Sequence, residues 1–216
     1  MSFTRAEHAF GEIHEQGIND LFAAFFRARP RHLIYGTPFF VSTTTAAGTS
    51  IAAIAFPGVP GGIEFAVSFR LPTVDVHPDS SGGSSPLVPG PGQLAIKTQV
   101  LLALLCRDGR RTNEVIQGAT VLRASLGVFG LCTPVVVNPA PGTGEIGIRL
   151  DRIELVDIKP DALESIIECL IQMILKAALA NVRLPFNTLT AGAFGLALLV
   201  GPTAEDDQIK VRGNVL

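Results

Sequence analysis

Charged side chains are scarce in this chain. They make up 17% of its 216 residues, whereas an ordinary soluble domain has about a quarter. The 17 Lys and Arg residues nearly balance the 19 Asp and Glu residues, which leaves a net charge of −2. Proteins that bind nucleic acid attract it with an excess of basic side chains. The sequence therefore predicts no nucleic-acid partner.

Recognisable catalytic and metal-binding motifs are also lacking. The sequence contains no His-Glu-x-x-His, no Gly-x-Ser-x-Gly and no Cys-x-x-Cys. Two of the four histidines, His8 and His14, stand near glutamates on an expected helix. Because no third type of ligand converges on them, we interpret them as solvated helix positions and not as a metal site. We expect no enzyme, no metal and no cofactor.

Cysteines are few and odd in number. The three, Cys106, Cys132 and Cys169, are widely spaced and each lies in an apolar stretch. A disulfide framework uses an even number of cysteines in a short secreted chain. Small buried thiols in a reducing compartment are the better interpretation.

No segment is suited to export or to membrane insertion. The first 17 residues carry acidic side chains early and have no apolar core of the signal-peptide kind. The stretch 161–182 is long enough to span a bilayer, but Glu164, Glu168 and Lys176 lie inside it and are costly at that depth. We therefore expect a cytoplasmic protein that does not span a membrane.

Hydrophobic residues are abundant in this chain. They make up 47% of it, and the mean hydropathy is +0.40. Many of them lie in the predicted helix 161–182, which opens after Pro160 with the capping box Asp161-x-x-Glu164. Before Asn181 its polar residues occupy only about a third of the circumference. We expect other elements to cover this helix on most sides, and the pair Glu164 and Glu168 to lie on its solvated face.

A second, amphipathic helix is predicted over Arg5–Arg29. Thr4-x-x-Glu7 is a capping box, apolar residues follow at helical spacing, and Pro30 ends the pattern. Its aromatic cluster of Phe22, Phe25 and Phe26 either packs on a sheet or docks a partner, and packing is the commoner use.

Between the helices the pattern is that of strands. From Ile63 to Leu71 apolar residues occupy alternate positions, and after Pro72 the phase shifts. The same shift occurs between Leu150 and Ile153, as a bulge in a curved strand would require. Further strands are predicted at 94–104, 119–131, 194–200 and 209–216, with a turn at 201–207. The whole predicts one α+β domain, residues 1–216, with a highly curved antiparallel sheet.

Three segments carry a resemblance to a known group of proteins. GINDLFAAFFRARPRHL at 17–33 resembles a first amphipathic helix that runs into a strand. IGIRLDRIELVDIKPDALESIIECLIQMILKAALANV at 146–182 resembles a strand that leads into a long helix. RLPFNTLTAGAFGLALLVGPTAEDDQIKVRGNV at 183–215 resembles a closing hairpin. Their order is similar to that of the tubular lipid-binding (TULIP) superfamily, which includes bactericidal/permeability-increasing-like domains and bacterial relatives.

The resemblance implies a long helix wrapped by the curved sheet around an apolar groove, which would bind or transfer a lipid or another apolar molecule. The expected ligand-lining residues are Phe65, Val67, Phe69, Ile166, Ile167, Leu170, Ile174 and Leu175. The same residues would serve equally well as a filled, dry core. The alternative function is a structural or assembly subunit, in a homodimer or a hetero-oligomer. Phe22, Phe25, Phe26, Phe39 and Phe40 would then form an interface.

Overall fold

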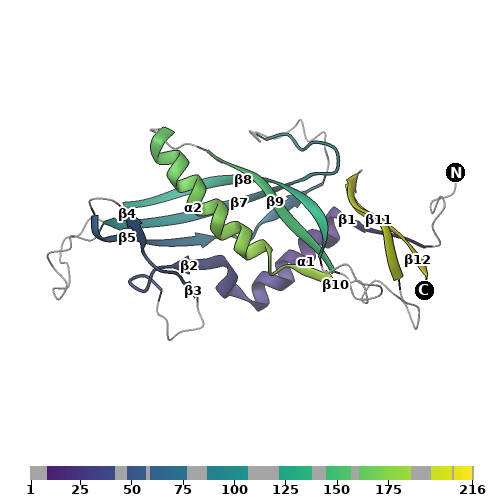
Figure 1. The fold of residues 1–216 in the computed structure, drawn as a ribbon, viewed down its shortest axis with the longest axis horizontal. Helices are drawn as coiled ribbons and strands as arrows, with labels where there is room; N and C mark the ends of the chain where they lie inside the picture. Colours follow the sequence, from purple (N-terminus) through teal and green to yellow (C-terminus); the bar gives the residue numbers. More distant parts are fainter. Residues whose placement is uncertain are drawn as a thin grey trace.

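The structure of the protein is a computed structural model, and the part of the chain that it describes is residues 9–41, 48–56, 59–76, 87–106, 122–137, 145–156, 161–185, 196–205 and 207–215. Strands predominate and two α-helices accompany them, so the predicted α+β class is confirmed (Figure 1). In chain order the elements are β1 Ala9–His14, α1 Glu15–Ala28, the 3-10 turn η1 Pro30–Leu33, β2 Ile34–Gly36, β3 Thr49–Ser50, β4 Ile54–Phe56, β5 Val59–Phe69, β6 Thr73–Asp75, β7 Leu94–Cys106, β8 Leu122–Val137, β9 Glu145–Val156, α2 Asp161–Leu179, β10 Arg183–Pro185, β11 Leu196–Glu205 and β12 Gln208–Val215.

The large sheet has the strand order β10-β9-β8-β7-β5-β2-β3, with β4 added on β5 and β6 on β7. Its pairs are antiparallel except for β2 and β3, which run parallel. Alternation sets its inner face: Phe65, Val67 and Phe69 on β5 are buried, as are Val100 and Leu102 on β7. The sheet is curled, and both helices lie against it (Figure 1).

The predicted phase shift in β9 is a β-bulge. Leu131 pairs with Arg152 and Cys132 pairs with Leu150, so Asp151 is the extra residue. A bulge bends its strand and increases the local twist. The Asp151 carboxylate accepts hydrogen bonds from Thr133 Oγ1, from Arg149 Nε at 2.8 Å and from Gln93 Nε2 at 3.1 Å.

A separate three-stranded sheet, in the order β1-β12-β11, forms from the two ends of the described chain. The helix predicted over Arg5–Arg29 is therefore wrong at its start, because Ala9–His14 is a strand. Residues 1–8 lie outside the described part. Glu12 pairs with Lys210 of β12, and Gly11 would have weakened a helix interior. The helix starts only after His14, whose Nδ1 accepts a hydrogen bond from the Gln16 amide at 3.1 Å.

The predicted turn 201–207 is also corrected. Strand β11 continues through it to Glu205, with register shifts around Gly201, where φ is +98°. The hairpin reverses next to Asp207, at a φ of +62°. Asp and Asn tolerate this left-handed conformation better than most residues do, which accounts for an acidic residue at the reversal.

The two helices bury one face each. On α1 the buried residues are Ile18, Phe22 and Phe26, at i, i+4 and i+8. On α2 the buried residues are Ile167, Leu170, Ile171, Ile174, Leu175, Ala178 and Leu179. They belong to the same hydrophobic cluster as the inner face of the large sheet. Within the described residues, no helix is long and apolar enough to cross a membrane.

Candidate functional site

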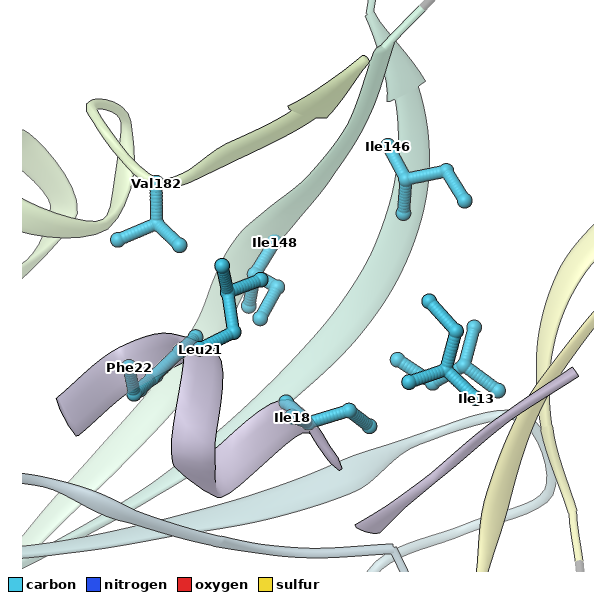
Figure 2. Close-up of a pocket in the computed structure, with 8 residues that line it drawn as sticks. Ile13, Ile18, Leu21, Phe22, Ile146, Ile148 and Val182 are labelled. Atoms are coloured by element: carbon cyan, nitrogen blue, oxygen red, sulfur yellow. The ribbon is translucent and has the colours of Figure 1, made fainter. Parts of the chain in front are cut away.

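An apolar pocket lies where the small sheet meets α1 and the large sheet. Figure 2 shows the lining side chains converging from helix α1 and strands β1 and β9. All eight are aliphatic or aromatic: Ile13, Ile18, Leu21, Phe22, Ile146, Ile148, Val182 and Ile209. The pocket therefore offers no polar or titratable side chain to a bound molecule.

Local periodicity explains how each element contributes. In α1, Ile18, Leu21 and Phe22 stand at i, i+3 and i+4, so they share one face. In β9, Ile146 and Ile148 are two residues apart and so point to the same side of the sheet. Ile13 of β1 lies directly opposite Ile209 of β12 in the antiparallel register. The eighth residue, Val182, follows α2 in a turn closed by its amide and the Leu179 carbonyl at 3.0 Å.

The walls of the pocket are held together mainly by side-chain packing. No ladder joins the two sheets among the described strands, although the Glu15 amide donates to the Asp207 carbonyl at 2.8 Å and ties α1 to the hairpin. Six of the lining residues are buried, whereas Ile13 and Leu21 are partly exposed. These two form the accessible rim.

The cavity has a volume of about 40 Å³. An engineered dry cavity that binds benzene has about 150 Å³, and pockets for drug-sized ligands have about 300–1,000 Å³. In this conformation the pocket is therefore large enough for the end of an apolar chain, but not for a whole lipid.

None of the eight ligand-lining residues expected from the sequence lines this pocket. Seven are buried in the main hydrophobic cluster: Phe65, Val67 and Phe69 on β5, and Ile167, Leu170, Ile174 and Leu175 on α2. The eighth, Ile166, is 51% exposed and lies on the opposite side of α2, so its expected place inside the fold is corrected. The pocket residues were recognised in the sequence only as periodic apolar positions. The missing signal was the pairing of β1 with β12, which no local pattern encodes.

The outward side of α2 is apolar, contrary to the prediction that other elements cover the helix on most sides. We use the name outer face of α2 for Ile166, Cys169, Met173 and Ala177 of the helix together with Ala180, which follows its last residue. All five are exposed, Ile166 and Met173 by 51% and 56%. The expected solvated pair, Glu164 and Glu168, is instead half-buried beside β9.

Three carboxylates gather at that edge. Oxygen atoms of Glu154, Glu164 and Glu168 lie within 4.8 Å of one another. The Leu155 amide donates to Glu168 Oε1 at 3.3 Å, and Arg152 is 3.5 Å from Glu154. Oxygen ligands of this kind suit hard cations, but exposed acidic groups are common without one, and no other feature of the described residues points to a cation here.

The aromatic cluster of α1 belongs to the interior. Phe22 and Phe26 are 0% and 2% exposed, and their rings meet edge to face at 5.9 Å. Two of the five phenylalanines considered for an interface are thus covered within this chain. Phe39, in contrast, is 51% exposed and packs against Phe40 at 4.9 Å.

The titratable groups with altered pKa values lie away from the pocket. Burial raises the pKa of Tyr35 to about 12. Burial, aided by the charge of Asp151, raises the pKa of the Cys132 thiol well above its usual range. Cys132 is 0% exposed, which agrees with the predicted buried position of this thiol. Partial burial also opposes ionisation of Asp151, but hydrogen bonds from Thr133, Arg149 and Gln93 outweigh it and lower the pKa of that carboxyl.

Comparison with known proteins adds little to this geometry. No protein-family model matches the chain, and no curated protein does. One similar solved structure is that of a lipopolysaccharide binding protein, with 12% sequence identity and a TM-score of 0.33. The similarity covers 96% of this chain and 50% of that one, so the chain spans about half the length of the protein that it matches. A TM-score this low does not establish a common fold.

Proposed function

We propose that this protein binds an apolar molecule, such as the acyl chain of a lipid, and holds it by burial without making or breaking a bond. The observation that carries the proposal is the pocket between the two sheets, whose eight lining side chains are all apolar. A site of this composition has no nucleophile, acid or base for catalysis. Its affinity would come from removing apolar surface from water, about 0.8 kcal/mol per methylene.

A whole acyl chain requires the pocket to lengthen. The small sheet packs against α1 and β9 without a shared ladder. To move outward it would lose side-chain contacts and the hydrogen bond between the Glu15 amide and the Asp207 carbonyl. A chain that enters at the rim of Ile13 and Leu21 would replace those contacts with its own methylenes. Five buried methylenes would contribute about 4 kcal/mol toward the cost of these lost interactions.

Native mass spectrometry of the purified protein, followed by solvent extraction and lipid analysis, tests the proposal. We expect discrete adducts of lipid mass, either as purified or after incubation with mixed lipids. Ile13→Phe should reduce them several-fold, because a larger side chain would fill the rim. Ile63→Phe is the matched control, since Ile63 is also a partly buried strand residue but lies outside the pocket. A mass that stays bare in mixed lipids would refute the proposal.

A second candidate function, that of an assembly subunit, is favoured by the outer face of α2. Larger contiguous apolar patches on a protein surface mark sites of interaction with a protein or a membrane. The same mass measurement separates the two functions, because an assembly subunit would retain no lipid.

A further inference from the structure

The outer face of α2 has a regular internal spacing. Its five members follow one another at intervals of 3, 4, 4 and 3 residues. The Ala180 amide still donates to the Lys176 carbonyl at 2.9 Å, so this residue continues the helical register and the five lie within an arc of about 80°. The order of intervals is the same from either end, with Met173 at the centre. A helix that runs in the opposite direction therefore meets an identical row of positions.

Side-chain sizes follow the same symmetry in a complementary way. When the row is reversed about Met173, Ile166 stands opposite Ala180 and Cys169 stands opposite Ala177. Each pair sets a larger side chain against a methyl group, which is how packed helices interdigitate. A parallel pairing would set isoleucine against isoleucine at one end and alanine against alanine at the other, and would leave the second end loose.

We propose that α2 pairs in antiparallel fashion with α2 of a second copy of this chain, around a two-fold axis at Met173. Such an interface is isologous, because both copies use the same patch. It covers the exposed apolar residues of the outer face, Ile166 and Met173 among them, and it does not depend on whether the pocket binds a lipid.

Charge complementarity supports the second copy as the occupant. Glu154, Glu164 and Glu168 form an acidic cluster on one flank of the outer face. The exposed Lys176 lies toward the same flank, at the other end of the face. The two-fold axis runs perpendicular to the plane of the two helices, so this flank lies on the same side of both copies while the helices run in opposite directions. Lys176 of each copy therefore approaches the acidic cluster of the other. Opposite charges so arranged favour one orientation over its alternatives.

The contact is small, so the dimer should be weak. Five side chains from each copy are far fewer than the roughly 20–30 residues a side of a stable interface. We expect a monomer–dimer equilibrium that shifts with protein concentration in the micromolar to millimolar range. Sedimentation velocity over a dilution series should show this shift.

Disulfide trapping tests the arrangement directly. Facing Cα atoms of packed helices lie about 4–5 Å apart, within the usual span of a disulfide. Met173→Cys, made in a Cys169→Ser background, should therefore form a covalent dimer under mild oxidation. Asn181→Cys in the same background is the control, because this exposed residue lies off the outer face and far from its own copy. It should give several-fold less cross-linked dimer, as should the parent variant.

Charge reversal provides the second measurement. Lys176→Glu and Glu168→Lys should each weaken the dimer, and the double variant should restore it, because the reversed charges attract again across the axis. The proposal is overturned by a chain that stays monomeric at millimolar concentration, or by a dimer in which the Met173→Cys variant does not cross-link. Co-sedimentation of the monomer with liposomes that depends on Ile166 and Met173 would assign the face to a lipid surface. That result would also overturn the proposed dimer.

Discussion

Replacement of Phe22 by alanine would enlarge the pocket from within. Phe22 is fully buried, lines the cavity of about 40 Å³ and meets the ring of Phe26 edge to face at 5.9 Å. The substitution Phe22→Ala would join the space of the lost ring to the existing cavity. The combined volume would approach that of an engineered dry cavity that binds benzene, which is about 150 Å³.

The expected loss of stability follows from these contacts. Replacement of a buried phenylalanine by alanine costs about 3–5 kcal/mol, of which the edge-to-face pair contributes about 0.5–1.5 kcal/mol. The whole domain has about 5–15 kcal/mol of stability, so the variant should remain folded but marginal. Benzene that binds the enlarged cavity should raise the free energy of unfolding of the variant again, by about 2.7 kcal/mol at a hundred times its Kd.

Urea denaturation with and without benzene measures both effects. Phe39→Ala is the matched control, because it removes the same ring from another edge-to-face pair, at a residue that is 51% exposed. It should cost about 1 kcal/mol or less and show no response to benzene. Equal losses for the two variants, or a Phe22→Ala protein that benzene does not stabilise, would refute the assignment of Phe22 to the wall of a dry pocket.

Three further predictions concern single positions. Asp151→Asn should lower the free energy of unfolding at neutral pH, because the carboxylate is stabilised in the folded state, where its pKa is lowered. As the pH falls below about 3.9, the ordinary pKa of Asp, this stabilisation is lost and the difference between variant and wild type should shrink. Urea titrations at several pH values measure the difference. Gly62→Ala should be more destabilising than Gly92→Ala in thermal melts, since both have φ near +75° but a Cβ at Gly62 would lie 2.5 Å from a backbone oxygen of β4, whereas at Gly92 it would meet nothing within 4 Å. In the native protein a thiol reagent should modify the exposed Cys169 and leave the buried Cys132 intact, as peptide mapping would show; a fast reaction at Cys132 would contradict its buried position.

Local patterns predicted the strands well where one face is buried. The alternation around Phe65 and Phe69 appears as β5, and the phase shift after Leu150 appears as the bulge at Asp151. Both follow from the two-residue period of a strand, which a single segment carries by itself. The predicted helix from 161 appears as α2, Asp161–Leu179, because the helical spacing of apolar residues is also carried by a single segment.

Pairings between distant segments were not predictable in this way. The interval between Phe10 and Ile13 suits a helix, yet β12 pairs with residues 9–14 and makes them a strand, because the ladder outweighs a weak helical preference. The expected ligand-lining residues likewise depended on which side of α2 the sheet would cover.

The sequence by itself determined how much apolar surface this chain must bury and which elements carry it. The tertiary structure alone decided where that surface is incompletely filled or covered. The apolar pocket forms because β1 pairs with β12 beside α1. Ile166 and Met173 stay exposed because α2 packs on the sheet with its other side. Periodicity within one segment specifies its own faces, whereas the partner of each face depends on residues far away in the chain.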